Sequence, residues 1–134
     1  MRILYLMAMF FVVAPLHAQT MPNADIRDVI TQQLDALQQD DFVAAFEFAS
    51  PLIQNMFQTP ERFGQMVAQG YPMVHRPQSY QFDALRDVAG GQWQSVIMYD
   101  ATGRGFMVEY QMIETAAGWR INGVQVTPLP EAQV

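Results

Sequence analysis

Apolar residues recur at helical spacing near the start of the chain, between residues 24 and 39. The apolar positions of this stretch are Ile26, Val29, Ile30, Leu34 and Leu37. Polar residues such as Arg27, Asp28 and Asp35 fall on the opposite side. This period predicts an amphipathic helix with one buried face. Asn23 is expected to cap the helix, because its side chain can accept a hydrogen bond from an unpaired backbone N–H.

Three later positions carry the signature of a new helix. Asp41 precedes an apolar stretch, while Ser50 and Thr59 are each followed by a proline. A capping residue followed by proline is typical of a helix start, because proline fits the first helical position. The predicted helices cover residues 42–49, 51–57 and 60–70. Gly70 is expected to end the last of them, and residues 71–77 are expected to form a loop.

From Ser79 onward the pattern changes from helical spacing to alternation. The predicted strands cover residues 79–86, 92–100, 105–114 and 119–126. In the third strand, one face is expected to carry Phe106, Val108, Tyr110 and Met112. In the first strand, one side is expected to carry Tyr80, Phe82 and Ala84. Asn122 and Gly123 interrupt the last strand and predict a bulge, and residues 127–134 are expected to form a loose tail.

The order of these elements predicts the fold class. Helices come first and about four antiparallel strands follow, which is typical of an α+β domain with the helices packed on one face of the sheet. The sequence predicts a single domain over residues 19–134, with an ordered core over about residues 24–126.

The first 18 residues have the pattern of a signal peptide. Arg2 gives a positive start, residues 3–16 are free of charge, and Ala18 ends a plausible cleavage site. The apolar run is too short to span a bilayer comfortably. We therefore expect cleavage after Ala18 and a periplasmic or secreted protein with no stable membrane anchor.

Charge and composition exclude several chemistries. The 134-residue chain has no Cys, a net charge of −6, and seven basic residues that are all Arg. An acidic chain is a poor partner for nucleic acid. Without Cys or Lys, thiol catalysis and Schiff-base chemistry are closed, and no glycine-rich phosphate loop is present. We expect no cofactor, and the scattered Met residues and the single His of residues 19–134 predict no metal site.

Several short runs taken together resemble a known family. They are residues 33–37, Asp41 with Ala45 and Phe46, residues 48–51, Phe63 with Met66 and Val67, residues 70–72, Asp100 with Gly103, and residues 118–121 with Gly123. The pattern covers about residues 26–126 and resembles an uncharacterised bacterial domain-of-unknown-function family of exported proteins. That family is similar to the nuclear transport factor 2-like superfamily, also called SnoaL-like or ketosteroid isomerase-like. The resemblance implies a curved, cystatin-like cone with an internal pocket, and it implies no activity.

Six residues are candidates for a binding site. Tyr99, Tyr110 and Trp119 can line a pocket and orient a ligand through a hydroxyl or indole N–H, or they can be core residues. Glu109 can be a buried carboxylate with a raised pKa, or it can pair with Arg120 across neighbouring strands and serve structure alone.

His75 is the sixth candidate and lies in the loop predicted for residues 71–77. A loop His can act as a general base, a metal ligand or a pH switch, and it can equally be a structural residue. Asp41 and Ser50 are interpreted as helix caps rather than as catalytic groups.

Two classes of function follow. The first is a non-catalytic domain that binds a small apolar ligand or an envelope protein; one version of protein binding is a homodimer through a sheet face with Met107 and Ile113. The alternative is a cofactor-free enzyme, an isomerase or small hydrolase, using a carboxylate and a Tyr in the cone pocket. The absence of a convincing catalytic constellation favours binding.

Overall fold

Helices and sheet are segregated along the chain, as the sequence predicts. The computed structural model describes residues 21–89 and 91–131, and the predicted signal segment, residues 1–18, lies outside the described residues. The helices are α1 (Ala24–Gln38), α2 (Phe42–Glu47), α3 (Pro51–Phe57), α4 (Pro60–Gly70) and α5 (Pro72–His75). The strands are β1 (Ser79–Val88), β2 (Gly91–Tyr99), β3 (Gly105–Thr115) and β4 (Gly118–Pro128). The α+β fold class is confirmed.

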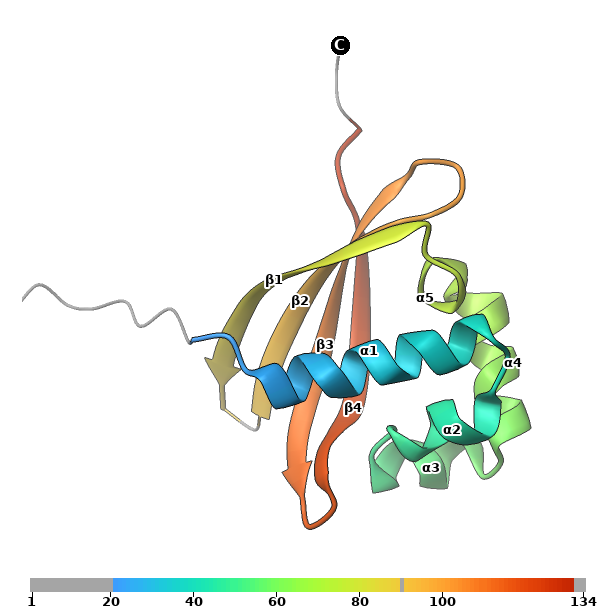
Figure 1. Cartoon of the computed structure of the whole chain (residues 1–134), viewed down its shortest axis with the longest axis vertical. Coiled ribbons are helices and arrows are strands. Elements are labelled where there is room, and N and C mark those ends of the chain that lie inside the picture. Colours follow the sequence, from blue (N-terminus) through green and yellow to red (C-terminus); the bar gives the residue numbers. More distant parts are fainter. Residues whose placement is uncertain (1–20, 90, 132–134) are drawn as a thin grey trace, which may run out of the picture.

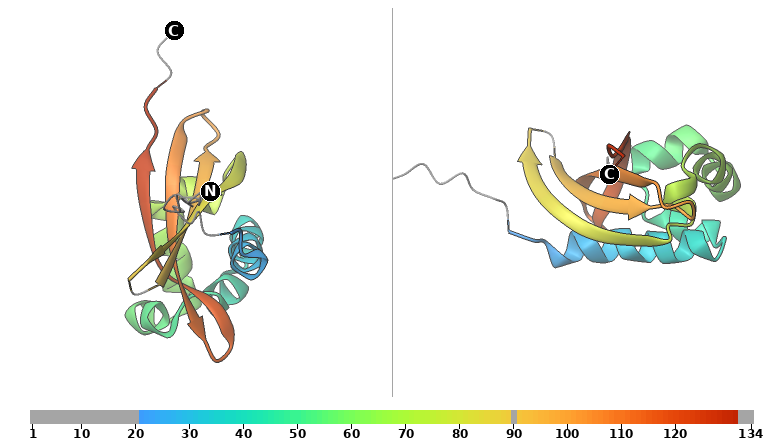
Figure 2. Two further views of the ribbon diagram at one scale, coloured as in Figure 1. Left: turned by 90° about the vertical axis from the view of Figure 1, so that its left-hand side faces the viewer. Right: turned by 90° about the horizontal axis from the view of Figure 1, so that it is seen from above.

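The four strands form an antiparallel sheet in the order β1-β2-β3-β4. Helix α1 crosses one face of this sheet, and α2 to α5 gather around the C-terminal half of α1 (Figure 1). Seen from above, β1 and β2 are strongly bent, and α1 runs alongside β1 (Figure 2). The helices therefore cover one face of the sheet, and we call this the inner face.

The helix starts follow the predicted capping residues. Asn23 Oδ1 accepts a hydrogen bond from the N–H of Ile26 at 3.1 Å, and Asp41 Oδ1 accepts from Ala44 at 3.2 Å. The hydroxyl oxygens of Ser50 and Thr59 do the same for α3 and α4, at 3.3 and 3.2 Å. These four side chains satisfy backbone N–H groups in the first turn and so fix where each helix begins.

The core lies between α1 and the inner face of the sheet. Fully buried members are Ile26, Ile30, Leu34, Leu37, Val96, Met98, Val108, Tyr110 and Met112. The predicted face of the third strand, from Phe106 to Met112, is confirmed by this burial. Alternation places every second residue of β3 on the inner face of the sheet, the face that α1 crosses. The apolar stripe of α1 and the apolar face of β3 bury each other, and this burial drives the packing.

The predicted bulge in the last strand is confirmed. Gln111 pairs with Gly123 and Met112 pairs with Ile121, so Asn122 is the extra residue. Ser50 Oγ donates a hydrogen bond of 2.8 Å to Asn122 Oδ1. The bulge thus turns Asn122 toward the α2–α3 junction.

The α2–α3 junction is attached to the edge of the sheet. Ile121 donates its N–H to the carbonyl of Phe48 at 2.9 Å, and its own carbonyl accepts from Ser50 at 2.8 Å. A short parallel bridge joins Ala49 to Ile121. This pairing fixes the helical layer on β4 and holds one side of the space described below.

Three details differ from the sequence-based prediction. Residues 72–75 form one helical turn, α5, instead of a plain loop, because Pro72 suits the first helical position. The placement of Ala84 with Phe82 was wrong: the register shifts between Phe82 and Leu85, so Leu85 is buried and Ala84 is exposed. Strand β4 also runs on to Pro128, two residues beyond its predicted end.

Candidate functional site

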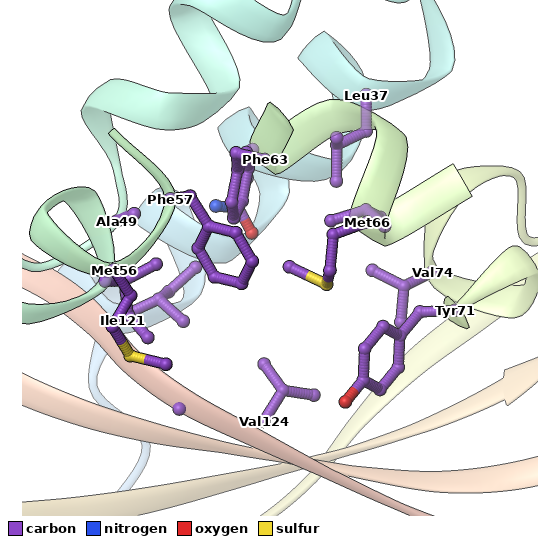
Figure 3. Close-up of a pocket in the computed structure, with 14 residues that line it drawn as sticks. Leu37, Ala49, Met56, Phe57, Phe63, Met66, Tyr71, Val74, Ile121 and Val124 are labelled. Carbon is purple, nitrogen blue, oxygen red and sulfur yellow. The ribbon is translucent and has the colours of Figure 1, made fainter. Parts of the chain in front are cut away.

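An apolar pocket lies where α3, α4 and α5 meet β4 and the C-terminal part of α1. Its volume is about 260 Å³. The lining residues are Gln33, Leu37, Ala49, Ile53, Met56, Phe57, Phe63, Met66, Val67, Tyr71, Val74, Ile121, Gly123 and Val124. In Figure 3, Phe57, Met66 and Tyr71 surround the open space while Val124 rises from the sheet. The helices and the sheet therefore lie close together here but leave a space between them.

The pocket has a buried interior and an exposed rim. Phe63, Val67 and Val74 are buried, whereas Met56 on α3 is 64% exposed. Aromatic contacts stiffen the helical wall, since the ring of Phe63 lies 6.0 Å from that of Phe57 in an edge-on arrangement. The position of Met56 identifies the α3 side as the mouth.

Helix α4 is held against the pocket from behind by α2. Gly64 faces the ring of Phe42 so closely that a Cβ atom there would lie 2.2 Å from Phe42 Cγ. Only glycine allows this approach. The Phe42–Gly64 contact thus sets the position of the helix that carries Phe63 and Met66.

Two polar side chains line the pocket. Gln33 on α1 is 3% exposed, and its Nε2 donates a hydrogen bond of 3.1 Å to the carbonyl of Ala45. Tyr71 is half-buried, and its hydroxyl points toward the sheet (Figure 3). No Asp, Glu, Arg or His is among the described lining residues. The pocket therefore suits an uncharged molecule.

The six residues predicted for a site lie elsewhere and do not converge on one space. None of Tyr99, Glu109, Tyr110, Trp119, Arg120 and His75 lines this pocket. Tyr110 is fully buried on the inner face, and its hydroxyl has no described hydrogen-bond partner. Burial raises the pKa of the Tyr110 phenol well above its ordinary value. Tyr110 is therefore a core residue that stays protonated.

Glu109 lies on the outer face of the sheet and pairs with a residue that the sequence did not suggest. Its Oε1 accepts a hydrogen bond of 3.0 Å from Arg86 Nη2 on β1. Ser95 Oγ lies 3.5 Å from the same oxygen. The predicted pairing of Glu109 with Arg120 was wrong, because Arg120 is opposite Ile113, further along β3. Glu109 thus serves a cross-strand ion pair away from the pocket.

The remaining residues near the β3–β4 hairpin also have structural contacts. Arg120 donates to the carbonyl of Trp119 at 2.7 Å, and its guanidinium carbon lies 5.9 Å from the centre of the Phe48 ring. Trp119 packs half-buried against the core. Tyr99 is 42% exposed at the end of β2. These three residues do not converge on a common space.

His75 ties α5 to the corner between α1 and α2. Its Nε2 lies 2.7 Å from Asp40 Oδ1, and Arg76 Nη2 donates to Asp40 Oδ2 at 2.9 Å. The hydrogen bond from His75, reinforced by Arg76, holds the pKa of the Asp40 carboxyl below its ordinary value. His75 therefore acts here as a tether for the segment that brings Tyr71 and Val74 to the pocket.

The resemblance implied an internal pocket, but sequence reasoning missed the residues that line it, and of these only Gln33 had left a signal. Gln33 lies seven residues after Ile26 and four before Leu37, which places it on the buried stripe of α1. A polar residue on an apolar stripe indicates a buried polar group. The pocket has no such pattern, because it is space left between correctly predicted elements.

Two further findings concern residues 21–89 and 91–131. No helix in these segments is long and apolar enough to cross a membrane. The same segments hold no group of three or more His, Asp or Glu side chains arranged to bind a metal ion.

The class of protein can now be stated: an α+β domain with an apolar pocket between its helical layer and its sheet. Residues 19–134 match the family model described as Domain of unknown function (DUF4864), and the chain belongs to that family. Comparison with curated proteins and with solved structures gives no match.

Proposed function

We propose that this domain binds a small apolar molecule in the pocket between α3, α4, α5 and β4. The observation that carries the proposal is an apolar space of about 260 Å³ with a buried interior and a mouth at Met56. Its size is just below the range usual for ligand pockets, about 300–1,000 Å³. A cavity of about 150 Å³ can hold benzene, so this space suits a ligand of about ten non-hydrogen atoms.

Binding is favoured over catalysis by the chemistry of the lining. A cofactor-free isomerase or hydrolase needs a carboxylate and a second polar group that converge on the substrate. Gln33 and Tyr71 are the polar side chains of the described lining, and neither is a carboxylate. Glu109 faces the other side of the sheet, where Arg86 engages it. The pocket therefore supports the role of a binding protein.

The direct test uses naphthalene, an apolar probe of about the right size, followed by its fluorescence. The wild-type protein should bind it saturably. The variant Val124→Trp, which fills the pocket from its floor, should bind at least about tenfold more weakly, a loss of about 1.4 kcal/mol. Val126→Trp is the matched control, since Val126 lies on the same face of β4 but does not line the pocket. Absence of saturable binding by the wild type, or an equal loss in both variants, would refute the proposal.

We further propose that the domain acts outside the cytoplasm after removal of residues 1–18. The support is the charge-free run over residues 3–16 and the small residue Ala18. The similarity to the nuclear transport factor 2-like superfamily belongs to the same proposal, supported by the order of helices and sheet and by a pocket between them. Native mass spectrometry of the exported protein tests the first part. The expected mass is that of residues 19–134, and a chain retaining residues 1–18 would contradict it.

A homodimer is the remaining proposal, through the outer face of the sheet. Met107 and Ile113 lie on that face and are half-buried, and it has no helix packed over it among the described elements. Analytical ultracentrifugation of the wild type and of Met107→Glu distinguishes a dimer from a monomer. A dimer that the substitution dissociates supports this interface, and a wild-type monomer at all concentrations excludes it.

A further inference from the structure

We infer that the pocket selects an apolar ligand carrying one uncharged hydrogen-bond donor, a hydroxyl or an N–H, which is received by Oε1 of Gln33. This inference rests on the proposed function and adds the class of ligand to it. It depends on one buried side chain whose orientation the structure fixes.

The orientation of the Gln33 amide follows from its partner. The side-chain nitrogen Nε2 lies 3.1 Å from the carbonyl oxygen of Ala45. A carbonyl oxygen can only accept, so the amide atom facing it must be the nitrogen. Oε1 therefore points away from Ala45, and no described residue donates a hydrogen bond to it. Because Gln33 lines the pocket, the pocket is where a donor for Oε1 can come from.

An acceptor in this position discriminates between ligands. Gln33 is 97% buried from solvent and is surrounded by apolar neighbours such as Leu37 and Phe63. A purely apolar ligand would displace any water from Oε1 and leave the acceptor unpaired, which is unfavourable. A ligand with a donor replaces that hydrogen bond and retains the apolar contacts. The pocket should therefore prefer the donor-bearing member of any pair of equal shape.

The same geometry disfavours acids. No Arg or His lines the described pocket, and the chain carries a net charge of −6. A carboxylate would enter an apolar space without a counter-charge and would meet the partial negative charge of Oε1. Fatty acids and aromatic acids are therefore excluded as preferred ligands, whereas neutral phenols, indoles and alcohols fit.

The test compares three probes of similar shape at neutral pH, namely 2-naphthol, 2-methylnaphthalene and 2-naphthoate. The wild-type protein should bind 2-naphthol about tenfold more tightly than 2-methylnaphthalene, and 2-naphthoate most weakly. In Gln33→Met, which keeps the length of the side chain and removes its amide, the two neutral probes should bind equally. Tyr71→Phe is the control, because it removes the other polar group of the pocket, and it should keep the preference.

A second readout uses the wild-type protein, so that it does not depend on the folding of Gln33→Met. The side-chain amide resonances of Gln33 should shift on addition of 2-naphthol and much less with 2-methylnaphthalene. Equal affinity for the two neutral probes overturns this inference and leaves the proposed function intact. Tighter binding of 2-naphthoate, or loss of the preference in Tyr71→Phe alone, also overturns it. If none of the three probes binds, the proposed function itself fails.

Discussion

The two halves of the helical layer meet the sheet in different ways. Under α1, the side chains of Ile30, Leu34 and Val108 are fully buried, and none of them lines the pocket. At the C-terminal part of α1, the helices α3 and α4 approach β4 around a space of about 260 Å³. The first half is a close-packed core, which we call the closed half, and the second contains a pocket with an exposed rim. The closest packing therefore lies under α1, whereas the core residues at the other end of the same layer also form the wall of the pocket.

The strongest test of this contrast deletes side-chain volume in each half. Leu34→Ala removes a fully buried side chain from the closed half and should lower the free energy of unfolding by about 2–5 kcal/mol. Met56→Ala shortens a side chain at the rim that is 64% exposed, and it should cost less than about 0.5 kcal/mol. Urea unfolding of both variants gives the comparison. Equal losses would show that the α3 side is packed as tightly as the core.

A second substitution probes what holds the pocket wall in place. Gly64→Ala would bring a Cβ atom to 2.2 Å from Phe42 Cγ, so the Phe42 ring or the helix that carries it must shift. We expect a loss of about 1–3 kcal/mol, even though alanine is the better helix former. Gly70→Ala is the control in the same helix, since a Cβ there has no atom within 4 Å. It should be neutral or stabilising by up to about 1 kcal/mol, and a loss at Gly70 equal to that at Gly64 would contradict the steric explanation.

The closed half contains a buried hydroxyl, that of Tyr110, for which the described residues offer no hydrogen-bond partner. Tyr110→Phe removes that buried hydroxyl and keeps the ring, so it should raise the free energy of unfolding by about 1 kcal/mol. Thermal unfolding of the wild type and the variant measures this change. A loss of stability would show instead that the hydroxyl is paired, for example with a buried water.

The smallest expected effect concerns the tether of α5. The pKa of Asp40 is lowered in the folded protein from an ordinary value of 3.8, mainly by the hydrogen bond from His75. A carboxyl with a lowered pKa stabilises the folded state above its unfolded pKa, and this contribution is lost as the pH falls through the folded value. Asp40→Asn should therefore be less stable than the wild type at pH 7, and the difference should shrink as the pH falls below 3.8 and through the lowered pKa of Asp40.

Asn is the appropriate replacement at this position. Asp40 has a φ of 55°, a left-handed conformation that Asn tolerates well, so the variant changes the charge without adding backbone strain. The midpoint of urea unfolding as a function of pH measures the effect. A difference between the variant and the wild type that is constant from pH 7 to pH 2 would rule out titration of Asp40 as its cause.

The sequence predicted the elements better than it predicted the space between them. Asn23, Asp41, Ser50 and Thr59 act locally, within three residues of the N–H groups that they accept from, so capping could be predicted directly. Alternation predicted the buried face of β3 for the same reason. Local patterns are thus sufficient for element boundaries and for burial.

Long-range contacts required information that local patterns do not contain. The partner of Glu109 is Arg86, two strands away in the sheet, and this depends on strand order and on the register shift in β1. The pocket depends on how far α4 stands from β4, which the contact of Gly64 with Phe42 helps to set. The candidate site was therefore placed on the conspicuous aromatic and charged residues of the strands, whereas the pocket is formed mainly by ordinary apolar residues of the helices.

The most direct test of the contrast between the two halves is the response of the methionine methyl groups to xenon, followed by NMR. Xenon enters dry apolar cavities whatever the natural ligand is. Met56 and Met66 line the pocket, and Met98 and Met112 are fully buried in the closed half. Xenon pressure should shift the methyl resonances of Met56 and Met66 and leave those of Met98 and Met112 nearly unchanged. Shifts of equal size in all four residues, or in none, would contradict the division of this domain into a closed core and an open pocket.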